Sequence, residues 1–243
     1  MRTLILALAL VLFPVSLLAQ WLPGHSPQEM AARQEQKKAV PGVIYPVSPG
    51  DAPSKGPADA PVVVIEYSDF QCPYCQSTSE IMRQLVEKFP NKIRFVFKNH
   101  PLPNLHKDAQ LAAEAALAAK AQGKFWEMHD LLFAFRDALG RTDLEGYARS
   151  IGLDMARFNR DLDNRVYAVQ VAKEAQEVID IGATGVPAVF VNGLFIKGSK
   201  PLEVYEEAVL AALGEIEASI HEDGDDEGCE EDDEAAAPGL DHP

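Results

Sequence analysis

The chain of 243 residues has 47% hydrophobic residues, typical of a globular protein, and a net charge of -15 at neutral pH. Residues 215–243 hold 13 Asp and Glu and no Lys or Arg, so the rest of the chain is close to neutral, with 24 acidic and 22 basic residues. Because no basic stripe is present, the composition argues against nucleic-acid binding, and we expect no nucleic-acid partner.

Residues 1–19 have the composition of a secretory signal peptide. An Arg follows the initiating Met, an apolar stretch runs from Leu4 to Leu18, and the small residue Ala19 follows. This apolar stretch is too short for a membrane-spanning helix, which needs about 20 residues. We expect export to the periplasm or another extracytoplasmic compartment. Leu17, where a small residue is usual before cleavage, leaves an uncleaved membrane anchor as the alternative.

Two further segments lie outside the predicted domain, which covers residues 57–213. Residues 20–56 are rich in proline and polar side chains, which predicts an exposed N-terminal tether with a candidate edge strand at residues 43–47. Residues 214–243 are too acidic to bury a core, and we expect a disordered tail. Weak binding of divalent cations is the alternative for this tail.

The domain begins with a predicted strand, helix and strand. Residues 62–67 form a continuous, largely β-branched run, typical of a strand covered on both faces. Ile81, Leu85 and Phe89 recur at four-residue steps, which predicts a helix, and residues 92–98 predict the second strand. With a helical crossover between them, the two strands should be parallel.

A helical subdomain is predicted to be inserted at about residues 104–181. Its expected helices lie within residues 111–121, 125–135, 144–151 and 165–179, with a short turn of helix near Met155. After Pro187, two apolar runs joined by Asn192-Gly193 predict a β-hairpin, and Pro201 opens a last helix. The predicted fold is therefore α/β, with a mixed sheet and the order βαβ, helical insert, ββα.

The sequence SDFQCPYC places two cysteines three positions apart, directly after the first strand. Pro73 suits the first turn of a helix, so Cys72 should lie at its N-terminus, where free N–H groups favour a thiolate. With the amides of Tyr74 and Cys75 as donors, we expect the pKa of Cys72 to fall from about 8.5 into a range of roughly 3.5–7.5. Cys75 should be better buried, with a more ordinary pKa. The pair would then combine an exposed attacking thiol with a resolving thiol.

This asymmetry favours thiol–disulfide exchange, because a stabilised thiolate makes the disulfide form a stronger oxidant. Two other interpretations of the pair stay open. A structural disulfide is one. A zinc site is the other, but it needs about four ligands. Cys229 lies in the tail, and His100 and His106 show no matching spacing. His100 follows the second strand, where it either faces the site or is a solvated loop residue.

Two motifs occur in this order: VVVIEYSDFQCPYC with its following helix, and TGVPAVFVNG before the hairpin and last helix. With these motifs the chain resembles the DsbA-like thiol:disulfide oxidoreductases of the thioredoxin superfamily, over about residues 57–213. The resemblance implies that Cys72 is the nucleophile and Cys75 the resolving cysteine of a redox-active disulfide. It also implies that Pro187 is a cis proline facing the dithiol. No metal or organic cofactor is expected.

Further site residues follow from the resemblance. The backbone of Val186 would pair with an extended substrate, and Pro73 and Tyr74 would also contact it. Glu66 would be a buried acid with a raised pKa that assists proton transfer to and from the resolving cysteine. The alternative for Glu66 is a carboxylate at the strand edge that pairs with Lys98.

These features predict an exported thiol:disulfide oxidoreductase that acts as an oxidase on cysteine-containing exported proteins, with a membrane redox partner that recycles the dithiol. Val186 before Pro187 resembles the oxidase branch. Pro73-Tyr74 instead differs from the Pro-His pair of the best-known oxidases and matches many glutaredoxins, which leaves the oxidising strength open. The alternatives are a reductase or isomerase kept reduced by a membrane partner, and a non-catalytic chaperone or binding module on the same fold.

Overall fold

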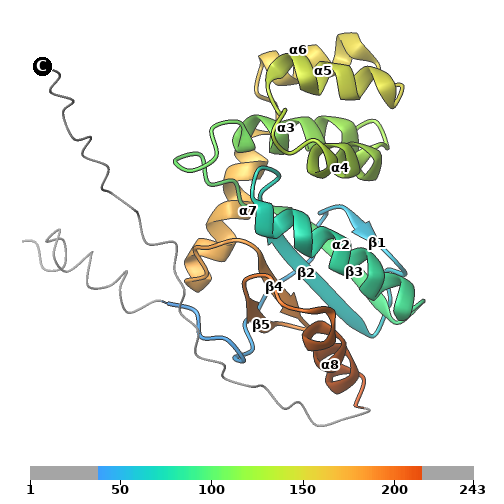
Figure 1. Cartoon of the computed structure of the whole chain (residues 1–243), viewed down its shortest axis with the longest axis vertical. Coiled ribbons are helices and arrows are strands. Elements are labelled where there is room, and N and C mark those ends of the chain that lie inside the picture. The colour runs from blue at the N-terminus through green and yellow to red at the C-terminus, as the bar shows by residue number, and fades with distance from the viewer. Residues whose placement is uncertain (1–37, 215–243) are drawn as a thin grey trace, which may run out of the picture.

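The computed structural model describes residues 38–214, which form a mixed five-stranded sheet with helices on both faces and a helical subdomain at one end (Figure 1). The strands are β1 (Ser54–Lys55), β2 (Val62–Ser68), β3 (Ile93–Asn99), β4 (Ala188–Val191) and β5 (Leu194–Lys197), in the order β1-β3-β2-β4-β5. β2 and β3 are parallel, with helix α2 (Pro73–Lys88) as the crossover, and the other neighbours are antiparallel. The predicted α/β fold is confirmed.

The inserted subdomain consists of more helix than the sequence pattern indicated. Its helices are α3 (Ala109–Lys120), α4 (Phe125–Ala134), α5 (Arg141–Ser150), α6 (Met155–Asp163) and α7 (Ala168–Ile181). The short turn expected near Met155 is the nine-residue helix α6, because the side chain of Asp154 accepts from the N–H of Arg157 and caps its first turn. The last helix, α8 (Leu202–Ala212), follows the hairpin as predicted.

The sheet is buried on both faces. Met82 and Leu85 of α2 and Tyr205 of α8 pack on one face, against alternate residues of β2, β3 and β4. On the other face, Val178 of α7 packs against the intervening residues, which include Tyr67. The buried stripe of α2 therefore runs through Cys75, Thr78, Met82 and Leu85. It does not run through Ile81 and Phe89, which are only half-buried.

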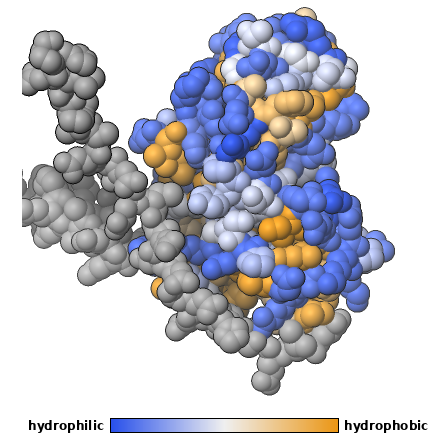
Figure 2. Space-filling model, in the orientation of Figure 1, coloured by the Kyte–Doolittle hydropathy of each residue, from blue (hydrophilic) through white to orange (hydrophobic). Residues whose placement is uncertain are grey.

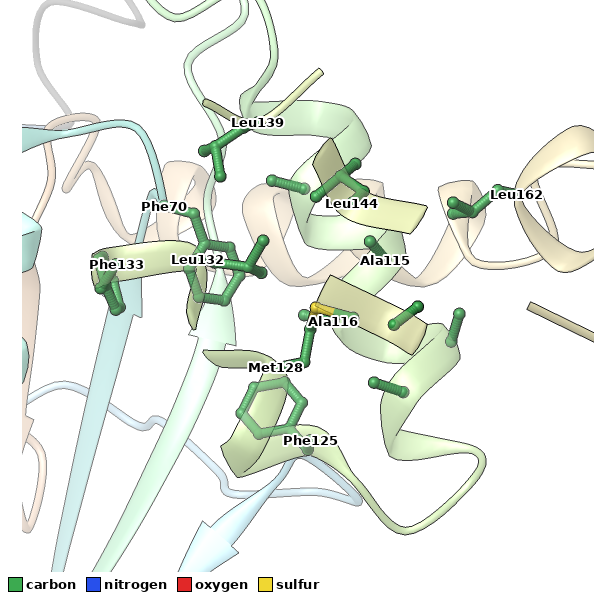
Figure 3. Packing of buried hydrophobic residues seen from close by; sticks show 14 of the residues in the cluster. Phe70, Ala115, Ala116, Phe125, Met128, Leu132, Phe133, Leu139, Leu144 and Leu162 are labelled. Atoms are coloured by element: carbon green, nitrogen blue, oxygen red, sulfur yellow. The ribbon is translucent and has the colours of Figure 1, made fainter. Parts of the chain in front are cut away.

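A third apolar cluster joins the turn before α2 to the helical subdomain. Figure 3 shows Phe70 beside Leu132 and Phe133 of α4. The ring centroid of Phe70 lies 4.9 Å from that of Phe133 and 5.0 Å from that of Phe97. Both cysteines belong to this cluster. The subdomain therefore forms one wall of the dithiol and anchors the turn that carries it.

The hairpin has the geometry that Asn-Gly predicts. Asn192 and Gly193 have φ angles of 45° and 87°, as a two-residue turn with both positions left-handed requires. The side chain of Asn192 also accepts from the N–H of Val63 at 2.7 Å. A Cβ at position 193 would lie 2.5 Å from the carbonyl oxygen of Tyr45, so only glycine fits there.

Within the predicted tether, the residues from 38 on contact the domain, although most side chains of residues 38–50 are exposed. The N–H of Ala39 donates to Gly182 O at 3.1 Å, and the ring of Tyr45 packs on the far face of the sheet. The candidate edge strand at 43–47 is a single bridge, at Ile44. The predicted signal peptide (1–19), the rest of the tail after residue 214 and Cys229 lie outside the described residues.

The surface shown in Figure 2 is mostly hydrophilic, with hydrophobic residues gathered in separate patches. Exposed large hydrophobic side chains include Tyr74, Leu105 and Phe135. Within residues 38–214, none of the helices combines the length and the apolar character needed to cross a membrane.

Candidate active site

The two cysteines occupy the N-terminus of α2, and both are free thiols. Cys72 is the N-cap residue and Pro73 is in the first turn, as expected. Cys72 is only 5% exposed and Cys75 is fully buried, so the exposed attacker that the sequence suggested is largely covered. The cover comes from the cluster of the helical subdomain, which half-buried Val186 also contacts.

The thiol of Cys72 is strongly acidified. Its pKa is lowered to about 6, first by a hydrogen bond from the Cys75 thiol and then by the backbone N–H groups of Cys75 and Tyr74, while burial opposes the shift. The two amides are those expected at a helix N-terminus. The largest contribution, the neighbouring thiol, had not been considered from the sequence.

The pKa of the Cys75 thiol is shifted in the opposite direction. Burial raises its pKa well above the ordinary value, and the hydrogen bond to Cys72 and the charge of that sulfur raise it further. The expectation of an ordinary pKa for Cys75 was therefore wrong. These shifts favour one thiolate at Cys72 and one neutral thiol at Cys75 in the reduced pair.

Glu66 lies in β2, in the middle of the sheet, and its side chain is fully buried. Neither of its carboxylate oxygens has a hydrogen-bond partner among the described residues. Burial raises its pKa to about 8, the nearby Ser68 hydroxyl opposes the rise, and the charge of Cys72 adds to it. At neutral pH, Glu66 is therefore mostly a neutral acid.

The alternative for Glu66, an edge carboxylate paired with Lys98, was wrong. The strand register places Lys98 opposite Tyr67, so its side chain leaves β3 on the face away from Glu66. There its ammonium group contacts Glu177 of α7 at 2.5 Å.

The segment before β4 forms the other side of the site. The peptide bond between Val186 and Pro187 is cis, as the resemblance implied. Val186 packs against the cluster that contains both cysteines. Pro73 and Tyr74 are exposed beside the dithiol, and 59% of the Tyr74 surface is accessible.

The two histidines after β3 each have a hydrogen-bond partner. His100 is buried, not solvated: its Nε2 lies 3.0 Å from the carbonyl oxygen of Thr184, and burial lowers its pKa. The Nδ1 of His106 lies 2.8 Å from a carboxylate oxygen of Asp69. Within residues 38–214, no three His, Cys, Asp or Glu side chains are grouped to hold a metal ion.

Asp69 was not singled out from the sequence, although it lies three residues before Cys72. Its N–H points to Sγ of Cys75 at 3.4 Å, and its carboxylate accepts from the N–H of Gln71 at 2.7 Å. A side chain that accepts from the amide two residues on forms an Asx turn. An Asp at the strand-to-helix turn was therefore a usable signal. The contact between Asp69 and His106 joins two segments that are distant in the sequence, and no local sequence pattern predicts it.

Residues 50–211 match the family model described as thioredoxin. The chain belongs to the thioredoxin family. A thioredoxin-like oxidoreductase from Silicibacter pomeroyi is 29% identical, with a TM-score of 0.62 over 68% of this chain and 94% of that one. BdbD from Bacillus subtilis, in its oxidised form, is 26% identical, with a TM-score of 0.64 over 73% of this chain and 99% of that one. The thiol-disulfide exchange protein alpha-DsbA2 from Wolbachia pipientis shares the fold at 23% identity, with a TM-score of 0.59 over 65% of this chain and 85% of that one.

These similarities confirm the predicted thioredoxin fold. The curated relatives are much longer proteins. A Na(+)/H(+) antiporter NhaA 1 from Salinispora arenicola is 43% identical over 171 residues, which are 70% of this chain and 26% of the antiporter. The chain thus spans about a quarter of the length of such relatives.

Proposed function

We propose that the protein is an exported oxidase that transfers its Cys72–Cys75 disulfide to cysteine-containing exported proteins. The observation that carries the proposal is the opposed acidity of the two thiols. Cys72 has a pKa lowered to about 6, whereas that of Cys75 is raised. A dithiol that is stabilised as a thiolate gives up electrons reluctantly, so its disulfide is a good oxidant.

The transfer takes two exchange steps. A substrate thiolate attacks Sγ of Cys72 in the protein disulfide, forms a mixed disulfide and releases Cys75 as a thiolate, which takes up a proton. A second substrate thiolate then attacks the substrate sulfur and releases Cys72 as a thiolate. The substrate loses two electrons and gains a disulfide, and the protein gains them as a dithiol.

Glu66 is the proposed proton donor and acceptor for Cys75. It is buried in the same region as the Cys75 sulfur. The charge of the Glu66 carboxylate raises the pKa of Cys75, and the charge of a Cys72 thiolate raises the pKa of Glu66. A neutral acid with a pKa near 8 can give its proton to the released thiolate and take it back at moderate cost. Among the described residues, the Glu66 carboxylate is the acid whose charge raises the pKa of Cys75.

Substrate contacts are proposed for Val186, Pro187, Pro73 and Tyr74. Val186 packs against the cluster of the sulfurs and Tyr74 is exposed next to Cys72, so the four residues border the reacting atoms from two segments. An extended polypeptide that passes over Cys72 would contact both of these segments.

The proposed setting is the periplasm or another extracytoplasmic compartment, where disulfides persist. The sequence supports it through the signal-like residues 1–19. A membrane redox partner would re-oxidise the dithiol after each transfer. The reductase or isomerase direction uses the same two steps in reverse. Equilibration with glutathione distinguishes the two directions, since a potential as low as about -270 mV would favour the reductase.

Changing Cys75 to serine should trap the intermediate. In this variant the Cys72 thiolate attacks a substrate disulfide and releases one substrate thiolate. Because no Cys75 thiol is present to displace the substrate from Cys72, the mixed disulfide should accumulate in cells as a larger species that disappears on reduction. Non-reducing gels followed by mass spectrometry would identify the bound polypeptides.

The matched control is the double variant Cys72→Ser, Cys75→Ser, which keeps the fold but has no attacking sulfur. Adducts of equal yield in this control would come from Cys229 and would contradict the proposed role of Cys72. Adducts that depend on Cys72 and contain exported proteins would support it.

A further inference from the structure

A buried carboxylate at Asp69 lies beside the dithiol and takes no part in the exchange steps. Its side chain is fully buried and both oxygens are engaged. One oxygen accepts from the N–H of Gln71 at 2.7 Å. The other accepts from the N–H of Leu102 at 2.8 Å and lies 2.8 Å from Nδ1 of His106, which donates because a carboxylate only accepts. These contacts from two segments fix the negative charge in one place.

The backbone of the same residue holds both cysteines. The N–H of Asp69 points to Sγ of Cys75 at 3.4 Å, and its carbonyl oxygen accepts from the N–H of Cys72 at 3.2 Å. The position of the charge is therefore tied to the position of the sulfurs. A displacement of the turn would move both.

Few charged groups act on the sulfur of Cys72. The Cys75 thiol and the N–H groups of the helix lower its pKa, whereas burial and the negative charge of Asp69 raise it. Glu66, the other acid nearby, is mostly neutral at pH 7. Asp69 is thus a fixed charge that works against the thiolate, and His106 is the titratable side chain in direct contact with it.

We propose that Asp69 is a positioning residue of the dithiol whose buried negative charge opposes the thiolate of Cys72 and so limits how strongly the protein oxidises its substrates. The inference rests on the proposed function, because it concerns the strength of the same disulfide. In equilibrium with glutathione, the protein disulfide and two glutathione thiols become the protein dithiol and one glutathione disulfide. Removing the opposing charge moves this equilibrium toward the protein dithiol.

The test is Asp69→Asn in the full chain, which removes the charge and keeps one side-chain oxygen as an acceptor. The pKa of Cys72, followed by thiolate absorbance, should fall by about one unit. The equilibrium constant with glutathione should shift about tenfold toward the reduced protein, which is about 30 mV. Loosening of the turn alone would weaken the hydrogen bonds to sulfur and move the pKa upward.

Asp108→Asn is the matched control, with the same change at the N-cap of α3, in a loop that contacts the turn of Asp69. Asp108 contacts Lys107 and the Gln71 amide, and does not act on Cys72. Its pKa and equilibrium should stay at the wild-type values. His106→Lys is a second variant if Asp69→Asn does not fold: it retains the carboxylate but places a permanent positive charge beside it, and should also lower the pKa of Cys72.

An unchanged or raised pKa of Cys72 in both Asp69→Asn and His106→Lys would overturn the inference, as would an equal fall in Asp108→Asn. Failure of the proposed function is a separate result. It would appear in the wild type, as a Cys72 that does not exchange with substrate thiols, whatever the variants do.

Discussion

Replacing Cys72 with serine should reduce the oxidation of a reduced two-cysteine peptide by at least about a thousandfold, to the uncatalysed rate. The hydroxyl of serine stays protonated and cannot form the mixed disulfide, so neither exchange step can begin. The measurement is the rate of peptide disulfide formation by pre-oxidised protein, under anaerobic conditions.

The control for this loss is Cys229→Ser, which changes a cysteine outside the described residues and should retain the wild-type rate. Circular dichroism should show that Cys72→Ser is folded, because the change is one atom at the N-cap of α2, where the free N–H groups can donate to the hydroxyl. Full activity of Cys72→Ser would instead support the non-catalytic chaperone or binding module.

Replacing Glu66 with glutamine should stabilise the protein as the pH rises. Burial raises the pKa of the Glu66 carboxyl from 4.5 to about 8 in the fold, so the folded protein retains a proton that the unfolded chain releases. Its contribution to stability is complete below about pH 4.5 and is lost as the pH rises through 8. The contribution of a glutamine side chain to stability does not change with pH, because its amide does not ionise. Relative to wild type, the variant should therefore gain roughly 3 kcal/mol in free energy of unfolding between pH 4 and pH 7.

The measurement is urea unfolding of the disulfide form at several pH values, because burial acts there without the charge of a Cys72 thiolate. Glu80→Gln is the matched control: Glu80 is an exposed carboxylate of α2 that pairs with Arg83, so its removal should give no gain toward alkaline pH. Parallel stability curves for Glu66→Gln and wild type would show that Glu66 ionises normally. The same variant should also slow the proton-linked release of Cys75.

The elements around the site could be predicted because their signals are local. A β-branched run predicted β2, Pro73 marked the start of α2, and Asn192-Gly193 fixed the hairpin with its left-handed turn. The cysteine spacing and the helix N-terminus together indicated an acidic Cys72, and the pKa of about 6 lies within the expected range.

Features that depend on packing between distant segments could not be predicted. The burial of Cys72 comes from the helical subdomain, whose inner surface has no signature in the cysteine motif. The contact of Lys98 with Glu177 follows from strand register and from the position of α7. The burial of His100 follows from the segment around Thr184, 84 residues later.

The acidity of Cys75 shows a second kind of limit. Its position in the helix suggested an ordinary thiol, because helix position was the only guide. The structure adds complete burial, a neighbouring thiolate and the carboxyl of Glu66, and all three raise its pKa. Desolvation of this kind is a property of the assembled core, and the position of Cys75 in the helix does not give its size.

The claim on which the other results depend is that Cys72 is a thiolate near neutral pH while Cys75 stays protonated. The most direct measurement is thiolate absorbance of the reduced Cys229→Ser protein as a function of pH, with the oxidised protein as the baseline. We expect one thiolate to appear with a midpoint near pH 6 and no second one by pH 8. A Cys72 that is still protonated above pH 8 would contradict the account.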